Sequence, residues 1–326
     1  MRALHVVTAI SNPLLLRSRI TLHQAFAEHM IASGVHLTTV ECAYGGRDFE
    51  TASHPGRHIG VRAPGEAIVW NKENLLNIGI ASLPDNADRI GTFDADIRFR
   101  NPSWVSDCLN ALDIRHVIQP WADCYDLGPN DENIGTHRSL GRLVAEGHPF
   151  DTKDQPETRR GPYDRHHHHP PHPRPRPIRI EGHPGYAWAW RRSVLEATNG
   201  LLETAAMGAG DRHMAYSLIG HASDSFEPSL TDDYKLHITR WQNKAVQAAN
   251  YNIGHSRGSI EHYFHGSKDD RSYHSRWQTL VRHRFSPSFD LAKNLQGVIM
   301  LSGNKPELRD DILRYLASRK EDANCL

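Results

Sequence analysis

The chain of 326 residues is poor in cysteine, has no long apolar run and carries no net charge at pH 7. Its 4 cysteines, Cys42, Cys108, Cys124 and Cys325, show no Cys-x-x-Cys spacing, which favours reduced structural thiols over a zinc site or a disulfide framework. Lys+Arg and Asp+Glu balance at 38 each, so no overall field favours nucleic acid or an anionic membrane. No segment approaches the roughly 20 apolar residues of a membrane helix, and the N-terminal apolar stretch is too short for a signal peptide. We therefore expect a soluble cytoplasmic protein.

The first part of the chain alternates strands and helices, as judged from its hydrophobic periodicity. With 38% hydrophobic and 23% charged residues, it has the composition of a folded protein with a sizeable core. The alternation predicts an α/β fold with an open, mostly parallel sheet flanked by helices. The expected elements are strands at Ala3–Ile10, Val35–Glu41, Arg89–Phe93 and His116–Pro120, and helices at Arg19–Ser33 and Asn71–Ser82.

The character of the sequence changes after residue 125. Residues 126–180 are rich in Pro, Gly and His and contain HHHHPPHPRPRP, which is typical of a solvated loop insertion, although a histidine run also binds Ni²⁺ or Zn²⁺ adventitiously. Residues 181–288 regain ordered patterns, with a late strand expected at Ser259–Phe264, and residues 289–326 read as a charged helical tail. We therefore divide the chain at these boundaries.

The stretch Gly91–Pro102 carries two carboxylates, Asp94 and Asp96, directly after an expected buried strand. Residues i and i+2 of a strand point to the same face, so both acids should project together from its end. Like charges this close repel each other, and a divalent cation between them removes that cost. The spacing indicates either a site for Mn²⁺ or Mg²⁺ or a pair of solvated turn acids.

Three segments, taken together and in order, resemble the GT-A glycosyltransferases, most closely the β-1,4-galactosyltransferase-like branch. Trp70–Gly79 (WNKENLLNIG) resembles the nucleotide-contacting segment, and Thr92–Phe99 (TFDADIRF) resembles the Asp-x-Asp that holds Mn²⁺ against the donor diphosphate. Gly185–Met214 looks like the acceptor segment with its catalytic acid, and Glu261–Gly266 (EHYFHG) resembles the late strand that often supplies a metal-binding histidine. The resemblance implies a GT-A (Rossmann-like) fold with an acceptor-side subdomain, a nucleotide-sugar donor and a divalent ion.

On the metal side, the resemblance implies Asp96 as the direct ligand and Asp94 as a contact to the metal or the ribose. His262 or His265 would complete the shell, or else be structural. A regular strand turns these two histidines to opposite faces, so we expect only one of them to bind. Glu41, at the end of its strand, would accept hydrogen bonds from uracil or ribose, or else be an exposed carboxylate.

Further donor contacts are expected from a helix and from a late basic segment. Lys72, Asn74 and Asn77 lie near one another on the predicted helix and would meet the phosphates or the ribose, the alternative being a solvated face. The cations that follow the late histidines would clamp the diphosphate on a closing loop; they are Lys268, Arg271 and Arg276.

On the acceptor side, Asp211 is the expected general base, because inverting transfer needs a carboxylate that removes the acceptor hydroxyl proton. Its structural alternative is the N-cap of the following helix. Tyr186, Trp188 and Trp190 alternate in sequence, so we expect three rings on one side of an extended segment, stacked on sugar rings or packed in the core. The family branch has a denser acidic loop, Gly-Gly-Glu-Asp-Asp, than this chain, which leaves the sugar specificity open.

These observations favour a metal-dependent GT-A hexosyltransferase that moves a sugar from a UDP-sugar to an acceptor hydroxyl, with inversion expected and retention open. Residues 1–125 would bind the nucleotide sugar and 181–288 the acceptor, which is a glycan, a lipid-linked glycan, a protein or a modified nucleobase. The chain lacks the stem, the membrane anchor and the disulfides of the Golgi enzymes of this branch, so we expect a bacterial or phage-type relative. The alternatives are a metal-dependent nucleotidyltransferase or phosphoesterase, and a metal-binding protein built around the histidine run at 166–172.

Overall fold

The computed structural model describes residues 2–147, 182–267 and 276–322, and a seven-stranded sheet forms its centre. Six strands run parallel and β9 runs antiparallel to both of its neighbours. The predicted fold class, an α/β protein with an open, mostly parallel sheet flanked by helices, is confirmed. The strand order across the sheet is β10 (Ile253–His255), β6 (Val117–Gln119), β9 (Ala187–Arg191), β4 (Arg89–Phe93), β1 (His5–Ser11), β2 (His36–Tyr44) and β3 (Arg57–Ala63).

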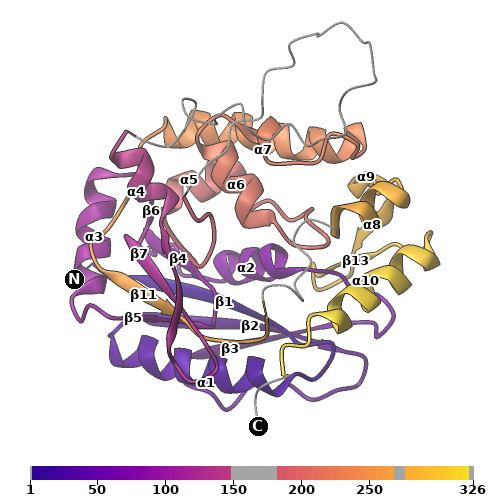
Figure 1. Ribbon diagram of the computed structural model, residues 1–326, viewed down its shortest axis with the longest axis horizontal. Helices are drawn as coiled ribbons and strands as arrows, with labels where there is room; N and C mark the ends of the chain where they lie inside the picture. The colour runs from indigo at the N-terminus through magenta and orange to yellow at the C-terminus, as the bar shows by residue number, and fades with distance from the viewer. Residues whose placement is uncertain (1, 148–181, 268–275, 323–326) are drawn as a thin grey trace, which may run out of the picture.

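Helices cover both faces of this sheet because its strands are apolar on both sides. Neighbouring residues of β1 show the alternation: Val6 packs with the core that contains Phe26, and Val7 with the core that contains Leu75. Figure 1 shows α1 on one side of the sheet and α2, α6 and α7 on the other. The helices of the first face are α1 (Arg17–Ala32) and α3 (Trp104–Ile114); those of the second are α2 (Lys72–Ala81), α5 (Arg192–Thr198), α6 (Gly210–Leu218) and α7 (Asp232–Ala249).

A smaller four-stranded sheet lies beside the first, and its strand β5 is the element that follows β4 in the chain. Its order is β5 (Ile97–Phe99), β11 (Ser259–His262), β7 (Asp123–Leu127) and β8 (Asn133–Arg138), and the short helix α4 (Leu140–Ala145) follows it. The expected boundary between residues 125 and 126 falls inside β7. β11 and β7 run parallel, and their register places His262 opposite Asp126.

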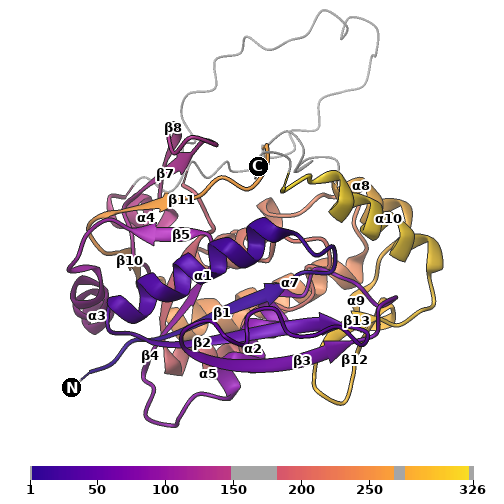
Figure 2. The same ribbon diagram turned by 90° about the horizontal axis from the view of Figure 1, so that it is seen from below.

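The last part of the chain is only partly helical, which corrects the expected helical tail. The remaining elements are the 3-10 turn η1 (Ala222–Asp224), α8 (Arg276–Arg282), α9 (Pro287–Asp290), the hairpin of β12 (Leu291–Lys293) and β13 (Ile299–Leu301), and α10 (Pro306–Ser318). Figure 2 shows α8 and α10 packed together, and α1 lying along the sheet.

Residues after α10 return to the start of α1. The carboxylate of Asp322 accepts hydrogen bonds from the backbone N–H groups of Arg17 and Ser18, at 2.8 and 2.9 Å. The first N–H groups of a helix have no partner inside it, and an acidic side chain there also favours the helix dipole. Asp322 therefore caps α1 from the far end of the described chain.

Within the described residues, no helix is both long enough and apolar enough to cross a membrane. Cys42, Cys108 and Cys124 are buried and not disulfide-bonded. They fit the expected structural thiols, and Cys325 lies outside the described residues.

We expect the protein to lose stability on mild acidification because of His23, which is fully buried between α1 and β2. Its burial, and next the charge of His54, lower the pKa of His23 from 6.5 to about 4. As the pH falls, His23 is therefore protonated in the unfolded chain before it is protonated in the folded protein. The neutral, buried His23 contributes its full stabilisation above the pKa of the unfolded state, and this contribution is lost as the pH falls towards the pKa of the folded state. The free energy of unfolding of the wild type, measured with urea, should be lower at about pH 5 than at about pH 7.5, and His23 should account for roughly 2 kcal/mol of the difference.

His23→Gln should flatten that difference, whereas the exposed His36→Gln should keep it. An equal pH response in His23→Gln and wild type would show that another group is responsible.

Candidate active site

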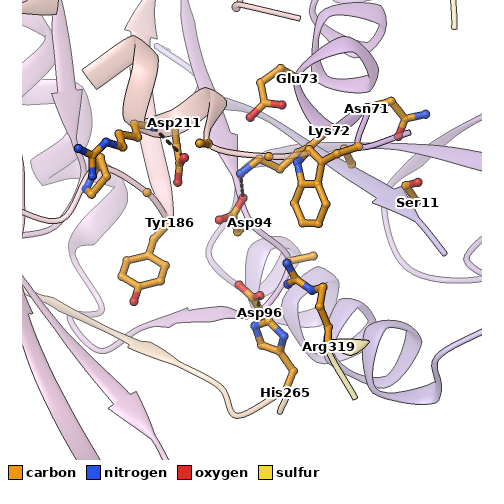
Figure 3. A pocket seen from close by; sticks show the side chains of 18 of the residues that line it. Ser11, Asn71, Lys72, Glu73, Asp94, Asp96, Tyr186, Asp211, His265 and Arg319 are labelled. Carbon is orange, nitrogen blue, oxygen red and sulfur yellow. Dashed lines mark hydrogen bonds and ion pairs between the residues drawn. The ribbon is translucent and has the colours of Figure 1, made fainter. Parts of the chain in front are cut away.

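A cavity of about 810 Å³ opens where the carboxyl ends of β1 and β4 meet the loop before α6. Open parallel sheets bind ligands at this edge, because the connecting loops diverge there. Its walls carry acids, bases and aromatic rings from distant parts of the chain, including Lys72, Asp96, Asp211 and Arg319 (Figure 3). Most of the chemistry-bearing residues expected from the sequence therefore face one space.

A cluster of Asp96, His262 and His265 lies at one end of the cavity, and it is the only group of three or more metal-ligating side chains in the described part of the chain. His265 Nε2 lies 3.0 Å from Asp96 Oδ2, and His262 Nε2 lies 3.7 Å from the same oxygen. The two Nε2 atoms are 3.2 Å apart. All three ligand atoms thus converge on one point.

The backbone explains why both histidines reach Asp96, against the expectation that only one would. β11 ends at His262, and the next residue, Tyr263, donates its N–H to the Asp96 carbonyl at 2.9 Å. His265 therefore lies beyond the strand, where the alternation of faces no longer holds. Gly266 has a φ of +92° and sits against the backbone of residues 319–321, where a Cβ would lie 3.1 Å from Arg319 O.

The cluster fits a divalent ion. Asp96 Oδ1 is buried without a hydrogen-bond partner among the described residues, which is costly for a carboxylate oxygen unless a cation takes it. Two imidazoles and one carboxylate suit Mn²⁺ better than Mg²⁺, which prefers oxygen ligands. Burial alone would raise the pKa of Asp96, but His262 and His265 hold the pKa well below its usual range. The carboxylate is therefore ionised and ready to bind.

Asp94 does not belong to this cluster. β4 ends at Phe93, so Asp94 and Asp96 lie in a turn and not on one face of a strand. Asp94 Oδ1 accepts a hydrogen bond from Lys72 Nζ at 2.9 Å (Figure 3). Burial is the largest influence on Asp94 and raises its pKa, while Lys72 opposes that rise. The sequence pair therefore splits into one metal-side acid and one acid paired with a lysine.

Lys72 carries the positive charge of the cavity centre. Burial by itself would lower the pKa of Lys72, but Asp94, Glu73 and Asp211 together raise it. Burial raises the pKa of Glu73 to about 7, which Lys72 partly offsets and Asp211 reinforces. The ammonium group of Lys72 thus interacts electrostatically with three carboxyl groups. Of these three, Glu73 is the one that is readily protonated near neutral pH.

Asp211 lies in the first turn of α6 and faces the cavity opposite the Asp96–His262–His265 cluster (Figure 3). Ala209, with a φ of +75°, takes the N-cap position, so the N-cap alternative for Asp211 is wrong. Among the described residues, the Asp211 carboxylate accepts a hydrogen bond only from the N–H of Arg212. Burial would raise the pKa of Asp211, but Lys72, His183 and the Arg212 N–H lower it on balance. The base expected from the sequence is therefore ionised at neutral pH.

The loop before Asp211 needs glycine for space. A Cβ on Gly210 would lie 2.5 Å from the Glu73 carboxyl carbon, and one on Gly185 would lie 2.7 Å from Asp211 Oδ2. Both distances are far inside van der Waals contact. These glycines let the carboxylates of Glu73 and Asp211 approach the backbone closely.

Three of the expected nucleotide contacts do not face the cavity. Glu41 is 3% exposed, and its carboxylate is taken by the N–H groups of residues 50 and 51, the Thr51 hydroxyl and His58. Asn74 donates to Glu203 and to the Gly297 carbonyl, and its oxygen accepts the Ile299 N–H. Asn77 bonds both backbone groups of Leu201, so these side chains hold the fold together.

The three alternating aromatic residues also separate. Tyr186 lines the cavity with a φ of +73°, just before β9 begins. Trp188 and Trp190 lie in β9 and pack in the core, with their indole N–H groups on the Pro184 carbonyl and the Thr92 hydroxyl. Because Tyr186 lies before the strand, the expected shared face does not form. Arg276 lines the cavity, whereas Lys268 and Arg271 lie outside the described residues.

Some residues that line the cavity were not predicted from the sequence. Glu73 and His183 line it, and burial followed by His137 lowers the pKa of His183 to about 3. Arg319 stacks over Trp70, with its guanidinium carbon 5.0 Å from the ring centre. Glu73 lies in the segment already singled out, so its charge was available as a signal. Nothing local to Arg319 indicates a site, because only the return of the chain to α1 brings it there.

Comparisons with known proteins found similarity only among solved structures. No family model matches the chain, and no curated protein matches it. The catalytic domain of Drosophila β1,4-galactosyltransferase 7, in complex with xylobiose, is 12% identical, covers 94% of this chain and 98% of that chain, and has a TM-score of 0.38. A mutant of that enzyme in complex with manganese, UDP-Gal and xylobiose is also 12% identical, covers 94% and 97%, and has a TM-score of 0.37.

Two further solved structures are similar to the chain at a comparable level. A nucleotide-diphospho-sugar transferase from Desulfovibrio desulfuricans, so named provisionally, is 9% identical over 87% of this chain and 99% of that chain, at a TM-score of 0.31. A 4-diphosphocytidyl-2C-methyl-D-erythritol synthase from Anaerococcus prevotii is 8% identical over 79% and 89%, at a TM-score of 0.34. Similarity this weak carries no argument about function, which is therefore argued from the cavity.

Proposed function

We propose that the chain is a metal-dependent glycosyltransferase of the GT-A type, which moves a sugar from a UDP-sugar to an acceptor hydroxyl with inversion. One observation carries the proposal: the Asp96–His262–His265 cluster and the carboxylate of Asp211 face each other across one cavity of about 810 Å³. That volume is within the roughly 300–1,000 Å³ of small-molecule sites. It suits a donor bound at the metal end and an acceptor at the Asp211 end.

The cationic side chains support a diphosphate at the metal end. Lys72, Arg276 and Arg319 line the cavity, and Trp70 offers an aromatic face beside Arg319. Fixed cations are the groups that bind phosphate oxygens and stabilise charge as it develops on a leaving group. A divalent ion held by Asp96, His262 and His265, with Mn²⁺ the best match, would add Lewis-acid stabilisation of that diphosphate.

At the other end, Asp211 is the proton acceptor. The acceptor oxygen forms the new bond to the anomeric carbon while the bond from that carbon to the phosphate oxygen breaks. The electron pair leaves with the nucleoside diphosphate, and the hydroxyl proton passes to the Asp211 carboxylate. The acceptor is a hydroxyl of a glycan, a lipid-linked glycan, a protein or a modified nucleobase, with Tyr186 as an aromatic wall beside it.

The test is calorimetric titration with UDP and with uridine, each in Mn²⁺ and in EDTA. UDP should bind with Mn²⁺ and lose affinity in EDTA, whereas uridine, which lacks the diphosphate, should not respond to the metal. A panel of UDP-sugars would then identify the donor from UDP release. The absence of metal-dependent UDP binding would refute the proposal, and release of UMP and sugar phosphate would favour the phosphoesterase alternative.

A further inference from the structure

Asp126 is a buried carboxylate that lies behind the metal cluster and does not line the cavity. It is 1% exposed and sits near the end of β7. The parallel pairing of β7 with β11 places it directly beside His262. The register of the second sheet therefore gives one cluster histidine an acid as its neighbour.

Three side chains donate hydrogen bonds to this carboxylate. Oδ1 accepts from the Tyr186 hydroxyl at 2.9 Å and from His262 Nδ1 at 2.9 Å, and Oδ2 accepts from His137 Nε2 at 2.6 Å. The tyrosine hydroxyl is a donor to Oδ1, and a carboxylate in its usual charged form only accepts, which makes both ring nitrogens donors as well. The hydrogen bond to His262 therefore places a proton on Nδ1 of that ring.

The proton on Nδ1 determines whether the Nε2 atom of His262 directs a lone pair towards the cluster. A neutral imidazole protonated on Nδ1 keeps its lone pair on Nε2. This Nε2 points to Asp96 Oδ2 at 3.7 Å and to His265 Nε2 at 3.2 Å. A lone pair directed at a carboxylate oxygen suits a shared cation, which is the arrangement that metal-binding histidines obtain from a carboxylate on their other nitrogen.

We propose that Asp126 is a positioning residue that fixes His262 in the Nδ1–H tautomer and orients its ring for the metal. The inference rests on the proposed function, since it assumes that the cluster binds a divalent ion. It also gives Tyr186 a second role, because its hydroxyl is hydrogen-bonded to Asp126 while the residue lines the cavity. His137 also helps to hold the carboxylate in place through its bond to Oδ2.

The first test needs neither metal nor activity. In metal-free protein labelled with ¹⁵N-histidine, the ring-nitrogen shifts of His262, assigned by difference from His262→Gln, should report the Nδ1–H tautomer. Asp126→Asn keeps a carbonyl oxygen that accepts the same hydrogen bond, so it should keep this tautomer. Asp126→Leu removes the acceptor, and His262 should then show a mixture of tautomers.

The second test is the Kd for Mn²⁺ measured by calorimetry. Asp126→Leu should weaken binding by about 10–100-fold, and Asp126→Asn by less than about tenfold. Asp290→Leu is the matched control, because Asp290 is equally buried at 1% exposure and accepts bonds from Ser286 N and Lys305 Nζ outside the cavity. It should lower the melting temperature and leave the Kd for Mn²⁺ unchanged.

The outcomes separate the inference from the function that it deepens. If wild type binds Mn²⁺ and the folded Asp126 variants bind it equally well, the inference is overturned and the metal site stands. An Nε2–H tautomer for His262 in wild type overturns it as well, even if Asp126→Leu fails to fold. If wild type binds no Mn²⁺, the metal site fails, and the inference fails with it.

Discussion

Asp96→Asn is expected to abolish Mn²⁺-dependent binding of UDP, with a loss of more than about 100-fold in the affinity for Mn²⁺. Outer-shell partners of a metal ligand already contribute 10–100-fold, and here the single carboxylate of the ligand set is removed. The asparagine has the same shape, so the loss should come with near-native melting behaviour. Titration with Mn²⁺, followed by UDP, measures both quantities on one sample.

Asp94→Asn is the matched comparison, because Asp94 lies two residues away in the same turn but pairs with Lys72. Its effect on the affinity for Mn²⁺ should stay within about tenfold, since it lies outside the group of ligand atoms that converge at Asp96. If both variants lose Mn²⁺ equally, the two acids of the sequence pair share the ion, and the ligand set inferred from the structure is wrong.

Asp211→Asn should lower kcat by about 10²–10⁴-fold while it leaves the metal-dependent affinity for UDP unchanged, as is typical for loss of a general base. The separation follows from the geometry, because Asp211 lies across the cavity from the cluster and is not one of its three members. Turnover is measured with the donor found in the panel, and the anomeric configuration of the product is read by NMR. Inversion is the expected stereochemistry.

Glu227→Gln serves as the control, because Glu227 is another half-buried acid on the wall of the same cavity. It should lose less than about tenfold in kcat, below the range of a general base. Should Asp211→Asn retain nearly full turnover, the proton acceptor is another group, and Glu73 beside it would be the first to replace. A retained configuration would refute the inverting mechanism alone.

Short-range patterns were sufficient for the class of the fold, although the strand β3, the helix α3 and the second sheet were not among the expected elements. The alternation of apolar runs and turn residues gave the strand at Arg89–Phe93 with its bounds as the structure has them, and the other expected elements of this region within a few residues. Hydrophobic periodicity is a local property, and each strand buried on both faces keeps it along its whole length. The class of the fold could therefore be predicted without any knowledge of long-range contacts.

Predictions of where individual side chains point, made by continuing the alternation of one strand, were less reliable. The alternation of Trp188 and Trp190 correctly puts both rings on one face, but it cannot say that this face is the core and not a ligand site. Tyr186 and His265 each lie just beyond a strand, where the period of two no longer applies. Both errors come from extending the alternation of a regular strand beyond its ends, before the first residue of β9 and after the last residue of β11.

Glu41 illustrates a different limit. A carboxylate at the carboxyl end of a parallel strand is well placed for a ligand, and the sequence predicts no more than that. In the structure the chain folds back over β2, so that the N–H groups of residues 50 and 51 satisfy this carboxylate. A backbone partner ten residues away took the place of a ligand, and no local signal distinguishes the two.

By itself, the sequence determined the α/β class and that Asp96, the late histidines and Asp211 lie at or near the ends of elements of that fold. The tertiary structure alone decided that Asp94 turns to Lys72, that both histidines reach Asp96, and that Asp126 lies behind one of them. The reason is physical. Periodicity encodes which face of one element is apolar, whereas hydrogen bonds and ion pairs between distant segments depend on strand order and register, which emerge only when the whole chain packs.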